Sequence, residues 1–483
     1  MISFACRLLA LGLLLGGCSL GPDYRAPIAE IPAAFRATPA TAAQAWPRPG
    51  WWRGFGSADL DTMIDDAEHS SFDIAAAMAR VRQADQQVRI SGAGLLPTVS
   101  GSAQAAYSGS AFRSGGLGGN AFRDARTYTV GPSASYEIDF WGRVRALQQS
   151  AEASALFSRF DQQTVALTTV VSIADTWFQA LALQDRLDVA GRNLRDSTQV
   201  LQAIQARLDA GTASLLDVSQ QAALVAGIRA QIPGLRSSME QQLNGLGILI
   251  GHPPEAIGPA NKGRPGSLRD LRLPEVDAGL PSELLARRPD VAAAEAQLLA
   301  ANANIREARA DFFPRITLTG STGFESLALG SLFGAGSVFA NAAAGAAQTI
   351  FDNGLKSGAY ELNKARYDEL LADYRRTVVQ AFTDVDNGIT AYRYATEQER
   401  LEQIAVDTAQ RAADIARAQL AAGTSDIVTA LQAQTTLFSD LDALAQIRGN
   451  RFQALVGLYR ALGGGWARDD VVVPPSTIYH GVL

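Results

Sequence analysis

The sequence predicts a mainly α-helical fold that also contributes β-strands to a membrane barrel, built as two similar halves. Three observations predict it. Residues 208–251 align without a gap on residues 420–463. Long stretches of helical composition, with heptad spacing in places, follow Gly142 and Gly354. Each half also holds segments in which apolar and polar residues alternate, as in a strand with one apolar and one polar face.

The repeat divides most of the chain into two halves, residues 58–251 and 281–463. The Gly-Thr pairs at 211–212 and 423–424 occupy the same place in the alignment, and Gly251 matches Gly463. The repeated unit is far longer than a solenoid repeat. The chain is therefore expected to be a duplicated structure with pseudo-symmetric halves.

Each half predicts the same order of helices. A first helical stretch, at about 58–93 or 281–312, ends before a proline that cannot continue it. A long helical stretch then runs to a Gly-Thr turn, and a return helix closes the half. A stretch of about 65 residues makes a rod of roughly 100 Å. Two long helical hairpins are expected, with their tips at 208–215 and 420–427.

Four strands are expected, at about 97–108, 127–140, 314–325 and 338–351. Strands of this length can cross a bilayer, and an open sheet edge is not tolerated in lipid. Because four strands cannot close a barrel alone, several chains must contribute to one barrel. Sequence logic allows two, three or four subunits. A soluble hairpin packed on the helices is the alternative interpretation.

The N-terminus has the order of a secretory signal. Arg7 precedes an apolar run at 8–15, which is followed by Gly16, Gly17 and Cys18. Leu15, Gly16 and Gly17 directly before Cys18 resemble a bacterial lipobox. The resemblance implies that residues 1–17 are removed and that Cys18 carries a covalent lipid as the first mature residue. The alternative is an ordinary signal with an incidental cysteine. Ser19 next to the cysteine, rather than aspartate, resembles the pattern of lipoproteins that are sent to the outer membrane.

Composition excludes several classes of protein. Two cysteines and three widely spaced histidines give no metal-ligand spacing, and no nucleophile elbow, phosphate loop or dinucleotide fingerprint is found. We expect neither enzymatic activity, nor a metal, nor a cofactor other than the lipid on Cys18. The net charge of −6 is spread without long runs of one sign, which argues against a nucleic-acid partner.

Several motifs together resemble one known family. The chain is similar to TolC-like outer-membrane efflux channels (outer membrane factors), specifically the NodT-type lipoproteins of resistance-nodulation-division pumps. The resemblance covers nearly the whole mature chain, and any one motif alone is weak. The motifs are CSLGPDYRAP at 18–27, WWRGFG at 51–56, LLARRPDVAAAEAQL at 284–298, DFFPRITLTG at 311–320, FDNGLKSG at 351–358 and the two Gly-Thr turns.

The resemblance implies a homotrimer in the outer membrane, with twelve strands in one barrel and twelve helical rods that continue it as a periplasmic tunnel. It implies a belt around the tunnel formed by residues 18–57, 252–280 and 464–483. It also implies two partners, a periplasmic adaptor (membrane fusion) protein and an inner-membrane pump of the resistance-nodulation-division type. The expected function is passive conduction of small molecules to the exterior.

In the family, the turns between the long helices form the periplasmic tip. The residues that the resemblance assigns to adaptor contact are Arg207, Leu208, Gly211, Thr212, Leu420, Gly423 and Thr424. A second interpretation needs no partner, because a helix end commonly requires a left-handed glycine. Both interpretations can hold at once.

The resemblance places a gate one turn beyond the tip. Its candidate residues are Leu216, Asp217, Gln220, Val428, Thr429 and Gln432. Leu216 and Val428 would form an apolar ring, whereas glutamine stands at 220 and 432 where relatives often carry aspartate. Asp217 and Asp426 could supply charge nearby, although Asp426 is placed to cap the helix that starts near Ile427.

Two other functions compete with efflux of small molecules. One is a conduit of the same fold for type I protein secretion. The other is a lipid-anchored periplasmic coiled-coil adaptor, which generally carries one hairpin and a lipoyl-like β-domain. Two hairpins and two strand pairs favour the channel.

Overall fold

The computed structural model describes residues 24–27, 31–32, 35–36, 46–113, 120–256, 266–274, 276 and 281–466. The signal segment, Cys18 and most of 464–483 lie outside them, so the expectations for those segments stay predictions. The chain forms two compact units. Unit one comprises 1–27, 81–157 and 294–374, and unit two comprises 28–80, 158–293 and 375–483.

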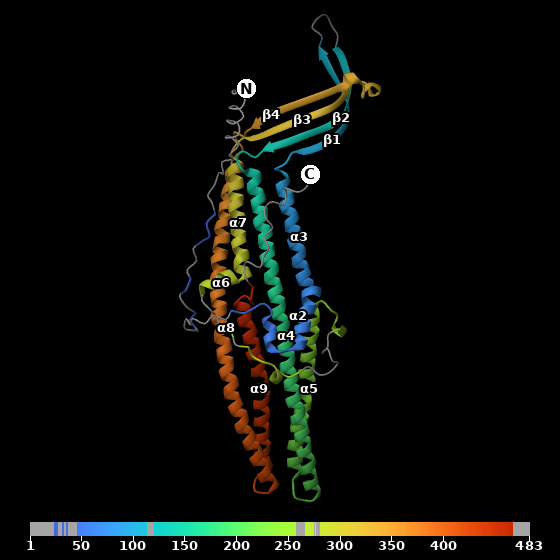
Figure 1. The fold of residues 1–483 in the computed structure, drawn as a ribbon. Coiled ribbons are helices and arrows are strands. Elements are labelled where there is room, and N and C mark those ends of the chain that lie inside the picture. The colour runs from blue at the N-terminus through green and yellow to red at the C-terminus, as the bar shows by residue number, and fades with distance from the viewer. Residues whose placement is uncertain are drawn as a thin grey trace. The chain divides into compact units, whose positions relative to one another are not determined.

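The two halves of the sequence contain the same series of elements (Figure 1). The first half has α2 (Ala58–Ser70), α3 (Phe72–Ala93), β1 (Thr98–Arg113), β2 (Asn120–Ile138), α4 (Arg143–Asp209) and α5 (Leu215–Ile250), and it is preceded by η1 (Trp51–Phe55). The second has α6 (Pro281–Arg287), α7 (Pro289–Ala310), β3 (Arg315–Ser326), β4 (Val338–Ala347), α8 (Leu355–Ala421) and α9 (Ile427–Ala461). Short 3₁₀ turns lie between them: η2 (Pro254–Ala256), η3 (Leu268–Asp270), η4 (Leu329–Ser331) and η5 (Ala335–Ser337).

The first helical stretch of each half is broken, which the sequence analysis did not predict. Ser71 separates α2 from α3 and has extended backbone angles, φ −61° and ψ 126°. Arg288 separates α6 from α7 and precedes Pro289, and a residue before proline is disfavoured in the α conformation. The long helices α4 and α8 are unbroken, with 67 residues each.

Unit one carries a four-stranded antiparallel sheet in the order β1-β2-β3-β4. The β1 and β2 strands are longer than expected, because pairing continues from Tyr107 opposite Arg126 to Arg113 opposite Asn120. Most of the glycine- and serine-rich segment between 108 and 126 is therefore strand and not loop. These residues have low strand propensity, but pairing between the strands satisfies the hydrogen-bonding groups of their backbone. The β4 strand ends at Ala347, earlier than the expected 351.

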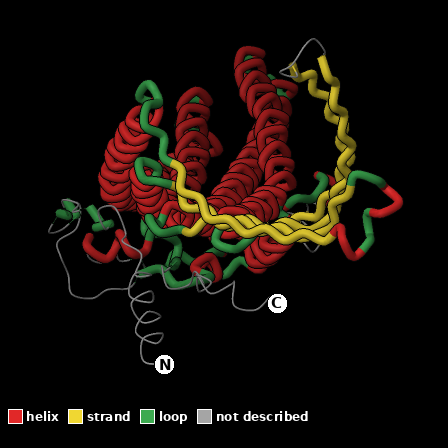
Figure 2. Tube along the Cα trace, turned by 90° about the horizontal axis from the view of Figure 1, so that it is seen from above, coloured by secondary structure: helices red, strands yellow, loops and turns green. Residues whose placement is uncertain are grey.

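The register gives the sheet one polar and one apolar face. Thr98, Ser135 and Thr319 lie in one row of paired residues, and a hollow of about 390 Å³ opens on that face. Tyr136 and Leu318 pair on the opposite face. The sheet is strongly curved (Figure 2). It therefore has the two surfaces that a segment of a membrane barrel needs.

The strand ends in unit one are fixed by an aromatic stack and a charged cluster. The Trp141 ring stacks on Phe313 with centroids 4.7 Å apart, and its Nε1 donates to the Pro314 carbonyl at 2.9 Å. Arg143 donates to both carboxylate oxygens of Glu137 at 3.0 Å and lies 3.9 Å from Glu307. These contacts hold the β2–α4 junction to the α7–β3 junction.

An aromatic core organises unit two. Phe55 of η1 lies 4.8 Å from Phe178 of α4 and 5.8 Å from Phe452 of α9 between ring centroids. The Trp51 ring stacks on Tyr459 at 4.4 Å. Thus η1, which precedes the first repeat, packs against α4 and α9 through this core. Leu268 of η3 is buried in the same core.

Among the described helices, α4 has the length and composition to cross a membrane. Polar residues interrupt the apolar ones along α4, so it holds no run of about 18 consecutive apolar residues. Of the apolar window, 56% is buried inside the chain, and Ile173, Ala174 and Phe178 belong to the core of unit two. Packing against the other core elements accounts for the apolar character of α4.

Acid is expected to weaken the contact between α8 and α9. The Glu399 carboxylate accepts from Arg448 at 2.8 Å and from Arg451 at 3.0 Å. Burial alone would raise its pKa, but these two bonds lower the pKa below 4.5, the ordinary value for a glutamate. Because the folded pKa is depressed, this contribution to stability is present above about pH 4.5 and is lost as pH falls through the folded pKa.

Glu399→Gln should therefore melt at a lower temperature than the unsubstituted chain at pH 7, and the difference should shrink at pH 3. Circular dichroism melts at both pH values measure it. Glu397→Gln is the control, since its exposed pair with Arg400 is screened by solvent and should matter little. Equal melting temperatures at pH 7 would contradict the prediction.

Candidate functional site

The first hairpin tip is a capped helix end. Gly211 follows α4 with φ +75°, which favours glycine, and its N–H donates to the Leu208 carbonyl at 2.8 Å. The Thr212 N–H donates to the Arg207 carbonyl at 2.8 Å, and the Thr212 hydroxyl donates to the same oxygen at 3.0 Å. This arrangement satisfies the carbonyls at the end of α4.

The second tip repeats this geometry after α8. Gly423 has φ +72°, and its N–H donates to the Leu420 carbonyl at 3.2 Å. The Thr424 N–H and hydroxyl both donate to the Gln419 carbonyl, at 2.9 and 3.2 Å. Helix capping therefore explains the glycine and threonine at both tips. It leaves the exposed outer surfaces of these turns free for a partner.

The helices that return from the tips are capped differently. Ser214 accepts from the Asp217 N–H at 3.2 Å while Asp217 accepts from the Ser214 N–H at 2.8 Å, which is a capping box. In the second half Asp426 is the cap and accepts from the Thr429 N–H at 2.7 Å, as predicted. That bond lowers the pKa of the Asp426 carboxyl.

Each tip thus carries one carboxylate at the N-terminus of its return helix, but the carboxylate occupies a different position in each half. Asp217 occupies the third helical position in the first half, and Asp426 the cap position in the second. In the alignment of the two halves, Asp217 corresponds to Thr429 and Ser214 corresponds to Asp426. The second half therefore lacks the carboxylate at the third helical position but has one at the cap position. Both carboxylates are stabilised by the positive end of the helix dipole.

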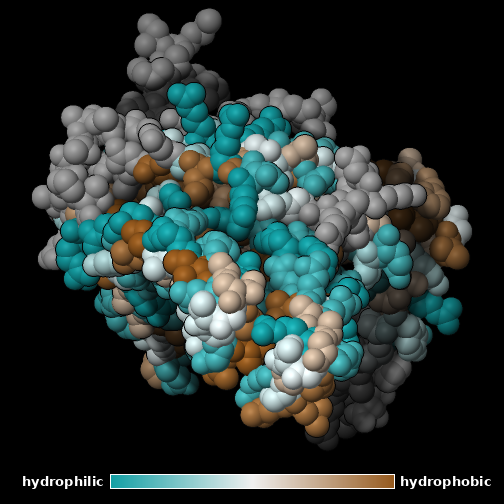
Figure 3. Space-filling model, turned by 90° about the horizontal axis from the view of Figure 1, so that it is seen from below, coloured by the Kyte–Doolittle hydropathy of each residue, from teal (hydrophilic) through white to brown (hydrophobic). Residues whose placement is uncertain are grey.

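The gate candidates lie on the first two turns of α5 and α9. Leu216 and Val428 are exposed large apolar side chains. Val428, Thr429 and Gln432 together line a cavity of about 500 Å³ against Ala409 and Ala412 of α8. Figure 3, the view from below, shows hydrophobic atoms lying among hydrophilic ones on this face. The structure brings the three second-half candidates to one cavity but does not assign them a role.

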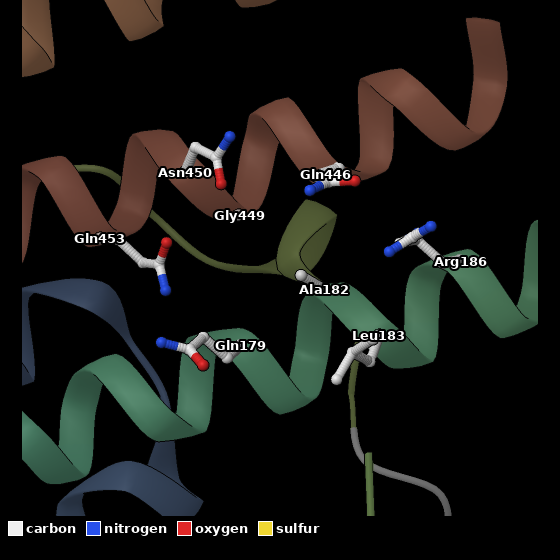
Figure 4. Close-up of a pocket in the computed structure, with 8 residues that line it drawn as sticks. All are labelled: Gln179, Ala182, Leu183, Arg186, Gln446, Gly449, Asn450 and Gln453. Carbon is white, nitrogen blue, oxygen red and sulfur yellow. The ribbon is translucent and has the colours of Figure 1, made fainter. Parts of the chain in front are cut away.

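Residues of α4 and α9 line a cavity of about 340 Å³, and most of these residues are polar (Figure 4). Gln179 and Gln453 face each other across it from the two helices. A Cβ on Gly449 would lie 2.7 Å from the Ala182 Cβ, so glycine permits the close approach of the helices here. This contact could not be predicted from the sequence, because a single sequence does not show which helices pair.

A charged contact and a buried polar cluster join α4 to α9, and the cluster also joins α4 to α5. Arg186 forms two hydrogen bonds to Asp442, at 2.9 and 3.0 Å. Closer to the tips, Gln434 donates to the buried Ser197 hydroxyl at 2.9 Å, and Gln221 donates to the Ser197 carbonyl at 2.7 Å. Buried polar contacts of this kind specify register between packed helices.

In the described part of the chain, no group of three or more histidine, cysteine, aspartate or glutamate side chains could hold a metal ion. Cys18, the expected lipidation site, lies outside the described residues. The prominent features of the described structure are therefore a two-faced sheet and two capped helical hairpins.

Comparison with known proteins decides the family. The model of the outer membrane efflux protein family matches residues 63–252 and 280–464. The chain belongs to this family. Both matched ranges lie close to the two halves, 58–251 and 281–463, expected from the repeat. The chain is thus an efflux protein of the outer membrane, in a family of channels and not of enzymes.

Relatives and solved structures extend over almost the whole chain. The pyoverdine export outer membrane protein OpmQ of Pseudomonas aeruginosa is 38% identical over 460 residues, covering 95% of this chain and 96% of OpmQ. The cation efflux system protein CusC of Escherichia coli is 29% identical, covering 95% and 99%. The outer-membrane channel OprN has a TM-score of 0.86 at 27% identity, covering 93% of this chain and all of that chain.

The open-state MtrE outer membrane channel of Neisseria gonorrhoeae is also similar. Its TM-score is 0.82 at 28% identity, and the match covers 94% of this chain and all of MtrE. These likenesses confirm the resemblance to TolC-like channels inferred from the motifs. They also exclude the adaptor interpretation, since the matched family consists of outer-membrane efflux proteins.

Proposed function

We propose that this chain is the channel subunit of a tripartite efflux system, in which three copies form one conduit. The observation that carries the proposal is the two-faced, curved sheet of unit one, whose edges are β1 and β4. Unpaired strand edges are costly in lipid. Pairing β4 of one copy with β1 of the next would remove every edge.

Three copies would give a twelve-stranded barrel, with the hydroxyl-bearing face lining the pore. The long helices would continue the barrel as a periplasmic tunnel of twelve rods. Residues 18–57, 252–280 and 464–483 would form the belt, which the packing of Trp51, Phe55 and Leu268 into the core of unit two supports. The lipid on Cys18 would add membrane affinity to that of the barrel.

The names of similar proteins support small molecules or ions as the cargo. They include pyoverdine export for OpmQ, toluene efflux for TtgC and cation efflux for CusC. The chain would conduct such cargo passively, since conduction requires a path without deep binding sites. The inner-membrane pump, of the resistance-nodulation-division type, would supply the energy through a periplasmic adaptor protein. The alternative is a conduit of the same fold for type I protein secretion, whose cargo would be a polypeptide.

Planar-bilayer conductance of the purified oligomer, with its mass measured in parallel, tests the proposal. We expect a trimer that conducts ions through discrete single channels. A monomer, or a trimer that never conducts even after removal of apolar side chains at Leu216 and Val428, would overturn it. Transport of a secreted polypeptide in place of small molecules would redirect the proposal to protein secretion.

The tips are proposed to contact the adaptor. Thr212→Cys and Thr424→Cys place thiols on exposed turns and remove one side-chain hydrogen bond each, at 3.0 and 3.2 Å. The backbone caps remain, so the turns should persist. Both variants are expected to crosslink to the adaptor in cells treated with a short thiol-to-amine reagent, detected by immunoblotting.

Ser237→Cys on the exposed surface of α5 is the matched control, because it shares the hairpin but lies away from the tip. It should give no adaptor crosslink. If neither tip variant crosslinks while the channel is folded and present in the outer membrane, the tip assignment is wrong.

A further inference from the structure

The connection between β3 and β4 has an unusual composition for a loop. Residues 327–338 contain no charged side chain. They fold into the short turns η4 and η5. Four large apolar side chains in this connection are exposed: Leu327 at 72%, Leu329 at 65%, Phe333 at 73% and Val338 at 61%. An exposed cluster of this kind marks a site of contact with a protein or with a membrane.

The connection is continuous with the apolar face of the sheet. Val130, Phe324 and Val338 pair across β2, β3 and β4, and so share that face. The Phe333 ring meets the Phe324 ring edge-on, with centroids 5.4 Å apart. The connection projects from the convex side of the curved sheet (Figure 2). Its apolar side chains therefore extend the surface that would face lipid in a barrel.

Several polar groups of the connection are paired within it or with Ser326. The Ser331 hydroxyl lies 2.8 Å from the Ser326 hydroxyl, and the Ser337 hydroxyl donates to the Ser331 carbonyl at 2.8 Å. Backbone N–H groups of Ser331, Leu332 and Gly334 donate within the same turns. Non-helical backbone can leave water only when its polar groups are satisfied in this way.

We propose that residues 327–338 form an apolar anchor that inserts into the acyl-chain region at the outer surface of the membrane. This inference rests on the proposed barrel. The anchor would hold the outer end of β3 and β4 at a fixed depth in the bilayer, as apolar side chains do at membrane interfaces. The absence of charge from the whole connection favours lipid over a polar partner surface.

Nitroxide labels on the full chain in vesicles of phosphatidylcholine and phosphatidylglycerol test the proposal. Leu329→Cys and Phe333→Cys report on the connection. Leu318→Cys and Thr319→Cys are adjacent references on the apolar and polar faces of β3. We expect labels at 329, 333 and 318 to collide several-fold more often with oxygen than with a water-soluble nickel chelate, and the label at 319 to show the reverse.

Preferential collision with nickel at 329 and 333, with 318 still in lipid, would overturn the anchor and leave the barrel intact. Dipolar broadening at 329 and 333 with little collision with either reagent would overturn it in favour of a second copy of the chain. If the label at 318 also collides preferentially with nickel, the proposed membrane barrel is wrong. Phe333→Trp gives a second measurement, as its added fluorescence should be quenched by brominated phosphatidylcholine.

Discussion

Gly463→Ala is expected to destabilise the second half severely. Gly463 has φ +84°, and a Cβ there would lie 1.9 Å from the Arg287 carbonyl oxygen, which is backbone and cannot turn away. Left-handed backbone costs a residue with a side chain roughly 1–2 kcal/mol, and overpacking adds about 1–3 kcal/mol. Typical domains have a margin of only about 5–15 kcal/mol.

The measurement is the amount of folded oligomer recovered from outer membranes, with thermal melts of whatever assembles. Gly457→Ala is the control, because Gly457 is helical and an added Cβ would meet no atom within 4 Å. Alanine there should leave the chain unchanged or stabilise it by up to about 1 kcal/mol. Normal recovery and melting of Gly463→Ala would show that the α6–α7 junction can shift to accept the Cβ.

Gly251 makes the corresponding contact in the first half. It has φ +83°, and a Cβ on it would lie 2.2 Å from the Ser70 carbonyl oxygen. The repeat in the sequence showed that Gly251 and Gly463 correspond, but not why. In each half the glycine ends the return helix and packs on the break between the first two helices. The duplicated residues therefore preserve a backbone contact between distant parts of each half.

The features that could be predicted from the sequence were those with local signals. The Gly-Thr turns and the cap at Asp426 depend on neighbouring residues, and the alternation in β2 and β3 follows from their own side chains. The lengths of β1 and β2 were underestimated, because pairing between the strands extends a glycine- and serine-rich segment that has little strand propensity of its own.

Other features depended on contacts that one sequence does not reveal. Gly449 resembles an ordinary helical residue in the sequence, and only the structure shows that it packs against Ala182. Likewise, the sequence does not reveal that Gln434 is buried and donates to the Ser197 hydroxyl. The break at Arg288 had a local signal in Pro289, but the helical composition on both sides outweighed it. Pairing of helices is a tertiary property, and helical periodicity alone does not choose the partner.

Arg288→Met is expected to have the second large effect. The Arg288 side chain is only 10% exposed and donates to Asp290 at 2.6 Å, to Asp384 at 3.1 Å and to the Ala461 carbonyl at 3.2 Å. Methionine would leave two carboxylates without their cation in a half-buried site. Removing one partner of a buried ion pair typically costs about 3–5 kcal/mol. Thermal melts of the purified oligomer measure the loss.

Arg287→Met is the matched control, since the Arg287 side chain is 37% exposed and its contact with Glu283, at 4.0 Å, is a surface pair. Such pairs contribute roughly 0.2–1 kcal/mol. The double variant Arg288→Met/Asp384→Asn separates charge from packing. If uncompensated charge causes the loss, removing the Asp384 charge should restore part of the stability. If the double variant is less stable than Arg288→Met alone, lost packing of the guanidinium against α8 and α9 dominates, and the electrostatic explanation is wrong.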